Sequence, residues 1–266
     1  MKPETTSYER EILSWRRRRI ERLTAPDGWL SVTGLFWIES GEHGAGSDPS
    51  AEIRLPAGRA PWKLGTFVVS ARGVVFRGPE GEVGVDAGSP EEKPVVRHGG
   101  LTLSVIERAG RFGVRVRDER SPARRTFHGI ESFPIDPAWR IDGLFEAYDP
   151  ARRIAMGSVL GDAQEERSTG AVLFRAGGAA QRLETILEHG EEDHWIVFGD
   201  ETNGSETYGG GRFVYVRPPV AGRTVIDFNR AYNPPCVFSP YTTCPLPPPE
   251  NRLTIRVEAG EKAYDG

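Results

Sequence analysis

Short apolar segments, each bounded by glycine or proline, recur along most of the chain, and this pattern restricts the fold more than any other feature. The 32 glycines and 21 prolines among the 266 residues supply the turns that such segments need. Because no convincing helix separates the segments of the second half, we expect antiparallel pairing in a barrel or sandwich. Strands are predicted at 52–55, 66–69, 73–76, 101–105, 112–117, 144–148, 153–159, 170–174, 181–187, 195–199, 212–216, 224–228 and 253–258. The predicted fold class is mainly β, with antiparallel barrel or sandwich sheets and an N-terminal α-helix.

That helix is predicted over residues 7–23. Thr6 followed by Glu9 is a capping-box pattern, in which each side chain accepts a hydrogen bond from a backbone N–H of the first turn. Arg16–Arg19 lie inside the helix, and successive residues are rotated by ~100°, so the four guanidinium groups cannot all face one phosphate groove. We therefore interpret them as a solvated basic face and not as a nucleic-acid site.

The overall charge restricts the partners of the protein. A net charge of -4 and a pI near 5.8 give no general attraction to nucleic acid or to anionic membranes. No apolar run approaches the ~20 residues of a transmembrane helix, and the N-terminal residues MKPETT lack the apolar core of a signal peptide. We expect a cytoplasmic protein that binds neither nucleic acid nor membrane, with homo-oligomer formation left open.

A proline-rich connection that ends near residue 137 suggests a domain boundary. The predicted division is an N-terminal helix plus a β-rich domain over 1–137, and a barrel-like β-rich domain over 138–266. One continuous unit is the alternative. Residues 41–50, GEHGAGSDPS, are predicted to form a loop.

The region 198–251 concentrates polar side chains among glycines and prolines, and we expect the functional site there. Its arginines could supply charge, its carboxylate and amides directional hydrogen bonds, and its tyrosines a stacking face. The segments 233–235 and 245–249 would form stiff proline walls. The candidate ligand-binding residues are Arg212, Asp227, Asn229, Arg230, Tyr232, Asn233 and Tyr241. The alternative is that these polar groups tie an irregular loop to the sheet.

Two local arrangements are expected inside this region. If Val225, Asp227 and Asn229 share one face of a strand, Asp227 and Asn229 point the same way. Arg230 is then placed to pair with Asp227 or with a carboxylate of a ligand. The polar loop 200–212, with three consecutive glycines, is either a tight hairpin turn or a mobile lid.

The chain contains no familiar reaction signature. There is no Gly-x-Ser-x-Gly elbow, and the five histidines lie outside 198–251, so no nucleophilic triad is supported locally. No CxxC, HxH or HExxH motif is present, so we predict no metal and no cofactor; an oxygen-ligand site of Asp200, Glu201 and Asp227 is the alternative. If the protein is an enzyme, Asp227 or Asp200 is the candidate general base, with Tyr208 as a further catalytic candidate.

Cys236 and Cys244, separated by seven residues, are the two cysteines of the chain. Three states are open: buried thiols, which a reducing compartment favours; a disulfide that closes the proline-rich loop; and a reactive thiol with a lowered pKa. Only the third state carries chemistry.

Three strings of the sequence resemble the hallmarks of a known family. They are FGDETNGSETYGGGRF, DFNRAYNPPCVFSPYTTCPLPPPENRL and, nearer the start, SVTGLFWIESGEHGAGSDP. They are similar to the domain of unknown function 1684 family, and the likeness extends over nearly the whole chain. The resemblance implies a soluble bacterial or archaeal protein, and it implies no activity and therefore no catalytic residues. The matching positions are Asp200, Thr202, Tyr208, Arg212, Asp227, Asn229, Arg230, Tyr232, Asn233, Cys236, Tyr241 and Cys244.

Three classes of function are open on this basis. The leading hypothesis is a protein that binds a small polar or anionic molecule in a pocket walled by the C-terminal proline-rich loop. The second is a hydrolase or lyase that uses Asp, Tyr and Arg chemistry at the same place. The third is a structural or assembly protein in which 198–251 is a buried brace.

Overall fold

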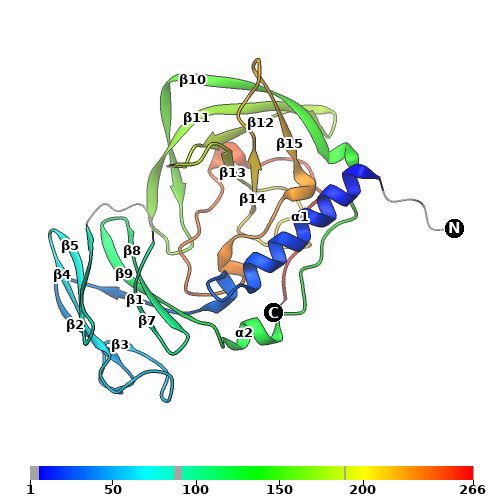
Figure 1. The fold of residues 1–266 in the computed structure, drawn as a ribbon. Helices are drawn as coiled ribbons and strands as arrows, with labels where there is room; N and C mark the ends of the chain where they lie inside the picture. Colours follow the sequence, from blue (N-terminus) through cyan, green and yellow to red (C-terminus); the bar gives the residue numbers. More distant parts are fainter. Residues whose placement is uncertain (1–5, 87–91, 189, 266) are drawn as a thin grey trace. The chain divides into compact units, whose positions relative to one another are not determined.

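The computed structural model describes residues 6–86, 92–188 and 190–265, and it is mainly β with an N-terminal helix, as predicted (Figure 1). The helix α1 (Ser7–Thr24) begins with the predicted capping box: Thr6 N donates to Glu9 Oε2 at 2.6 Å, and Glu9 N donates to Thr6 Oγ1 at 3.1 Å. No helix within these described ranges combines the length and the apolar character that crossing a membrane requires.

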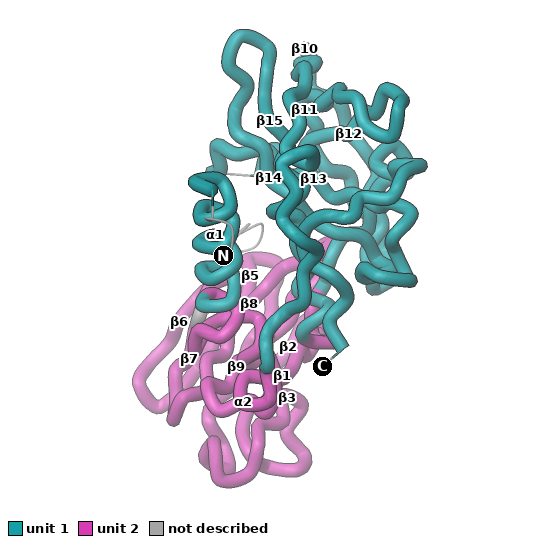
Figure 2. Tube along the Cα trace, turned by 90° about the vertical axis from the view of Figure 1, so that its right-hand side faces the viewer, with its two compact units in different colours: residues 1–21, 128–238, 243–266 teal, residues 22–127, 239–242 magenta. Residues whose placement is uncertain are grey.

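The chain divides into two compact units (Figure 2). Unit 1 consists of Met1–Glu21, His128–Phe238 and Thr243–Gly266, and unit 2 consists of Arg22–Phe127 and Ser239–Thr242. The chain therefore enters unit 2 twice, the second time for four residues only. Whether the predicted division at residue 137 marks domains that fold separately stays a prediction.

Unit 2 is built from two sheets. The first has the order β1-β9-β8-β7, and the second has the order β3-β2-β4-β5-β6. All neighbouring pairs are antiparallel except β2 and β3. The bounds are β1 (Val32–Ile38), β2 (Gly41–Gly46), β3 (Ile53–Arg54), β4 (Gly65–Ser70), β5 (Gly73–Gly78), β6 (Gly81–Asp86), β7 (Lys93–His98), β8 (Leu101–Arg108) and β9 (Arg111–Asp118), with the short helices η1 (Trp29–Ser31) and α2 (Pro122–Thr126).

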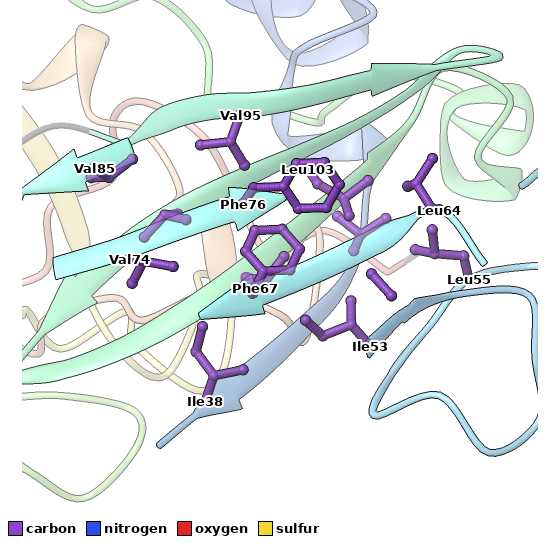
Figure 3. Packing of buried hydrophobic residues seen from close by; sticks show 14 of the residues in the cluster. Ile38, Ile53, Leu55, Leu64, Phe67, Val74, Phe76, Val85, Val95 and Leu103 are labelled. Atoms are coloured by element: carbon purple, nitrogen blue, oxygen red, sulfur yellow. The ribbon is translucent and has the colours of Figure 1, made fainter. Parts of the chain in front are cut away.

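Apolar side chains from both sheets form one core in unit 2 (Figure 3). Phe67 of β4 and Phe76 of β5 lie at its centre, with ring centroids 4.8 Å apart, and Leu103 of β8 is fully buried beside them. Buried residues alternate with partly exposed ones along β4, as a strand with one face on the core requires.

Unit 1 contains a single antiparallel sheet of six strands in the order β14-β13-β12-β11-β10-β15, which curves into a half-barrel. Figure 1 shows that β10 and β11, the longest strands, bend along their length. Phe198 and Phe228 meet in its core with ring centroids 5.3 Å apart. The bounds are β10 (Arg140–Gly157), β11 (Ala163–Ala176), β12 (Ala179–Ile186), β13 (His194–Phe198), β14 (Arg212–Val216) and β15 (Arg223–Asp227), with the 3-10 helices η2 (Pro137–Trp139), η3 (Phe228–Arg230), η4 (Pro235–Val237) and η5 (Pro249–Asn251).

Several predicted elements were wrong. The segments 144–148 and 153–159 belong to one strand, β10, whose pairing is interrupted between Ala147 and Arg152. The predicted loop 41–50 contains the strand β2, because its glycines still pair with β4 through their backbones. Residues 253–258 do not form a strand. Leu253 and Val257 alternate with polar residues because they fill the core of unit 1 from an irregular segment.

The basic stretch of α1 also differs from the prediction of a wholly solvated face. Arg17 and Arg18 are exposed, but Arg19 is 8% exposed and its Nε lies 3.2 Å from Glu261 Oε1. Arg16 donates from Nη2 to the carbonyl oxygen of Phe133 at 3.0 Å. Two of the four arginines therefore fix the helix to the rest of unit 1.

Candidate functional site

The polar loop that follows β13 is a compact turn whose side chains bind one another. Asp200 Oδ1 accepts from the hydroxyl of Thr202 at 2.6 Å, and the hydroxyls of Thr202 and Thr207 lie 2.8 Å apart, both fully buried. Gly211 has φ +86, and a Cβ there would lie 2.4 Å from Pro247. The glycines thus provide the close backbone approach and the positive φ expected of them, and the geometry is that of a tight turn.

Arg212, at the start of β14, is buried completely and forms an ion pair inside unit 1. Its Nη2 lies 2.8 Å from Asp200 Oδ2, and neither side chain is exposed. The guanidinium also donates to the carbonyl oxygens of Val257, at 2.9 Å, and Ala259. Burial lowers the pKa of Arg212, and the Asp200 carboxylate acts in the opposite direction. This arginine fastens the irregular segment 257–261 to the sheet.

Asp227 and Asn229 meet around the phenol of Tyr8, although they do not share a strand face as predicted. β15 ends at Asp227, and the next three residues form η3, capped by Asp227 Oδ1, which accepts from Asn229 N at 3.2 Å. Tyr8 of α1 donates to Asp227 Oδ1 at 2.8 Å and accepts from Asn229 Nδ2 at 2.9 Å. Burial raises the pKa of Tyr8, and the Asp227 carboxylate raises it further, so the phenol stays protonated.

Arg230 lies at the edge of this cluster and is the predicted site arginine that solvent reaches. Its side chain is 29% exposed and binds Glu11 of α1. Its Nε faces Asp227 Oδ2 at 3.4 Å. Across the parts of the chain that the structure describes, neither of these two buried atoms has a hydrogen-bond partner. Arg140 is the cross-strand neighbour of Asp227 and lies over the Tyr8 ring, with its Cζ 5.7 Å from the ring centroid.

Tyr232 and Asn233 belong to a second cluster, around Arg19 and Glu261. Asn233 N donates to Glu261 Oε2 at 2.7 Å, and Arg19 lies over the Tyr232 ring at 4.7 Å. Tyr215 stacks on Tyr232 with 6.3 Å between ring centroids. Burial raises the pKa of Tyr232 to about 12, so this phenol is a donor at neutral pH. The cluster joins α1, the segment after η3 and the C-terminal segment.

Tyr208 lies beside both cysteines and apart from the arginines. Cys236 Sγ is 3.5 Å from the Tyr208 hydroxyl, and Cys236 N donates to Cys244 Sγ at 3.1 Å. Both cysteines are thiols and not halves of a disulfide. Tyr241 is placed in unit 2, where its ring is partly exposed and its backbone N donates to Ser239 Oγ at 3.3 Å.

The predicted site residues thus do not converge on one point. Asp200 and Arg212 form one cluster, Asp227, Asn229 and Arg230 another, and Tyr232 and Asn233 a third. The first and third adjoin at Glu261, whose carbonyl oxygen accepts from Arg212 Nη1 at 3.3 Å. Among the residues described, no group of three His, Cys, Asp or Glu is placed to hold a metal ion, so the alternative site of Asp200, Glu201 and Asp227 is not assembled.

Sequence reasoning missed the partners that come from the two ends of the chain. Tyr8 and Glu11 lie about one helical turn apart on α1, Arg19 lies about two turns beyond Glu11, and Glu261 lies near the C-terminus. The spacing of the three on α1 could have shown that they share a face. Nothing in the sequence indicates that this face meets residues 227–233.

Comparison with known proteins gives a family and a distant structure. The family model described as "Protein of unknown function (DUF1684)" matches residues 125–262, just over half of the chain, and confirms the family. Two of the three strings lie inside this range, and SVTGLFWIESGEHGAGSDP lies outside it. No curated protein matches. Among solved structures, the chain is similar to an uncharacterized protein of Haloarcula marismortui determined by NMR in solution, with 27% identity over 53% of this chain and 80% of that one, and a TM-score of 0.45.

Proposed function

We propose that this chain, which belongs to the DUF1684 family of proteins of unknown function, binds a small polar or anionic molecule at Asp227 and Arg230. The observation that carries the proposal is the unused hydrogen-bonding capacity of this pair, Asp227 Oδ2 and Arg230 Nε. Buried polar atoms are nearly always hydrogen-bonded, so two unused ones that face each other at 3.4 Å call for an explanation. A ligand group that enters beside them supplies one.

The charges around the pair favour a ligand with both a donor and an anionic group. Arg230 and Arg140 are balanced by Asp227 and Glu11, so the cluster gives no strong attraction for a bare anion. A hydroxyl or amino group can donate to Asp227 Oδ2. A carboxylate or phosphate can replace Glu11, whose side chain is 55% exposed, on the Arg230 guanidinium. Small hydroxy acids, amino acids and sugar phosphates have this pattern.

The enzyme alternative has two candidate general bases, Asp200 and Asp227, and their environments differ. Asp200 is enclosed with Arg212 and is 0% exposed, which leaves no route for a substrate proton. Asp227 keeps one carboxylate oxygen without a donor, so it is the better candidate for a general base. We prefer the binding function to the enzyme alternative because binding requires no reacting group. If the protein converts a bound ligand and Asp227→Asn abolishes that conversion, the protein is also an enzyme.

A thermal-shift screen of the purified protein against small acids, amino acids and sugar phosphates tests the proposal. A compound that binds only the folded state raises the unfolding midpoint. We expect Arg230→Ala to abolish the shift, and Arg153→Ala to preserve it, because Arg153 is 78% exposed and pairs with the exposed Glu165.

Glu11→Ala keeps the experiment decisive if Arg230→Ala does not fold. Removing Glu11 frees the Arg230 guanidinium without removing a buried group, so a compound with an anionic group should bind more tightly to Glu11→Ala. No stabilising compound in the wild type, or an unchanged shift in Arg230→Ala, contradicts the proposal and favours the structural class of function.

A further inference from the structure

We propose that Cys236 and Cys244 form a reversible disulfide in which Cys236 reacts first with a peroxide and Cys244 then resolves the oxidised sulfur. This inference concerns a different cluster of unit 1 from the Asp227 and Arg230 site, and it does not depend on ligand binding there.

The two thiols are neighbours although seven residues separate them. The Cys236 backbone N–H donates to Cys244 Sγ at 3.1 Å, which places the second side chain directly against the first residue. Cys236 lies in η4, between the rigid residues Pro234 and Pro235 and the buried Phe238. A disulfide requires such proximity, because cysteines whose Cα atoms are more than ~7 Å apart cannot be joined without backbone movement.

The environments of the two sulfurs assign them different roles. Cys236 is partly exposed, whereas Cys244 is 4% exposed, so a small oxidant in solution meets Cys236 first. Cys236 Sγ also lies 3.5 Å from the Tyr208 hydroxyl. When Cys236 is ionised, that hydroxyl can donate to the thiolate, and a thiolate is the reactive form of cysteine.

The side-chain neighbours of Cys236 favour its ionisation. A side-chain hydrogen bond with Cys244 lowers the pKa of Cys236 to about 7, with a further contribution from Tyr208, while burial opposes both. The pKa of Tyr208 is raised, by burial first and by the adjacent thiol second, so the phenol keeps its proton as a donor. These directions agree with the roles that exposure assigns.

The reaction has two balanced steps. The Cys236 thiolate attacks one oxygen of hydrogen peroxide; an S–O bond forms, the O–O bond breaks, and hydroxide leaves, so the sulfur loses two electrons and the peroxide gains them. Cys244 then attacks the sulfenic sulfur; the S–S bond forms, the S–O bond breaks, and the departing hydroxide takes the Cys244 proton to become water. In total, two thiols and one peroxide give one disulfide and two water molecules.

The disulfide would close a loop at a defined place in the chain. Four of the seven residues between the cysteines, Ser239–Thr242, are grouped with unit 2, while both cysteines are grouped with unit 1. The bond would therefore join two residues of unit 1, one shortly before the chain leaves that unit after Phe238 and one just after it returns at Thr243.

The first experiment uses the reduced wild-type protein. After treatment with equimolar hydrogen peroxide and then with an alkylating reagent, we expect the intact mass to fall by about 2 Da. Both thiols should be protected from alkylation, and a thiol reductant should restore them. Two thiols that remain alkylatable, or irreversible oxidation of Cys236 without loss of the Cys244 thiol, would overturn the proposal.

Variants separate the attacking thiol from the resolving one. Cys244→Ser should accumulate a sulfenic acid at Cys236 that dimedone traps, because the resolving sulfur is missing. Cys236→Ser should leave Cys244 unreacted over the same time. If Cys244 in Cys236→Ser is oxidised and trapped by dimedone as fast as the wild-type protein reacts with peroxide, the assigned order is contradicted.

The pH dependence of thiolate formation tests the roles of the neighbours. The ultraviolet absorbance of the Cys236 thiolate should rise with a midpoint near pH 7 in the wild type. In Cys244→Ala the midpoint should move toward the ordinary thiol value of about 8.5, which lowers the thiolate fraction at pH 7 by up to roughly 15-fold. Tyr208→Phe should move it in the same direction, and Tyr241→Phe, in the same segment, should not. An identical midpoint in all variants contradicts the assignment.

Discussion

At the scale of single residues, two arginines with the same sequence signal have opposite environments. Arg212 and Arg230 both lie among polar residues of the hallmark region, yet Arg212 is enclosed with Asp200 and Arg230 reaches solvent beside Glu11. Burial therefore separates a structural arginine from a candidate binding arginine.

We expect Arg212→Ala to destabilise the fold strongly. The substitution leaves the Asp200 carboxylate buried without its partner, and breaking such a pair costs about 3–5 kcal/mol. The free energy of unfolding in urea measures the loss. Asp200→Asn combined with Arg212→Met should recover part of it, because the uncompensated charge is then absent.

The exposed pair of Arg153 and Glu165 is the matched control for this prediction. Arg153→Ala should cost less than about 1 kcal/mol, because both side chains are mostly solvated. If Arg212→Ala costs no more than Arg153→Ala, the Asp200 pair does not brace the C-terminal segment.

At the scale of elements, α1 contributes to two of the three polar clusters of the hallmark region. Tyr8 binds Asp227 and Asn229, Glu11 binds Arg230, and Arg19 binds Glu261 and the carbonyl oxygen of Asn233 at 2.8 Å. Figure 1 shows α1 running alongside the segment that follows β15. The helix is therefore part of the candidate site and not an independent extension.

Tyr8→Phe should loosen this attachment without unfolding the protein. The ring and its packing are kept, but Asp227 Oδ1 and Asn229 Nδ2 lose a partner, which costs about 1–3 kcal/mol. Urea unfolding measures the total loss, and hydrogen exchange of the α1 amides should accelerate. Leu13→Ala is a suitable control because Leu13 is 50% exposed on the same helix; unaltered exchange in Tyr8→Phe would show that the hydroxyl does not hold α1.

At the scale of the whole molecule, the division into units predicts which part of the chain folds alone. The core cluster of unit 2 is formed by buried residues between Ile38 and Val116, with Phe36 packed against it. A fragment of residues 22–127 should therefore unfold cooperatively. It lacks Ser239, whose hydroxyl donates to Val32 O at 3.1 Å, so it should lose about 1 kcal/mol for that bond.

A fragment of residues 128–266 is the counterpart. It retains the six-stranded sheet but lacks Tyr8 and Arg19, so Asp227 loses the hydrogen bond from Tyr8 and Glu261 loses its ion pair with Arg19. We expect this fragment to unfold at a lower temperature than the intact chain, as measured by circular dichroism. A 22–127 fragment without a cooperative transition would show that this unit does not fold independently.

The hallmark strings and the spacing of glycine and proline were sufficient to predict the family, the β class, the antiparallel pairing and the capped N-terminal helix. These properties depend on local chemistry: turn residues, alternation along strands, and a capping box whose partners are three residues apart. Most strands followed from the same patterns, but β1, β2, β6 and β7 were not predicted, and the strand predicted at 253–258 does not form.

The arrangement of the candidate site was decided only by the tertiary structure. Asp227 meets Tyr8 across 219 positions of the chain, and Arg19 meets Glu261 across 242. Such contacts depend on how helix and sheet pack, and no periodicity records them. The sequence therefore determined which polar residues the hallmark region contains. Folding decided which of them are enclosed by partners and which solvent still reaches, as it does Arg230 and Cys236. The reason is that burial is a property of the packed molecule.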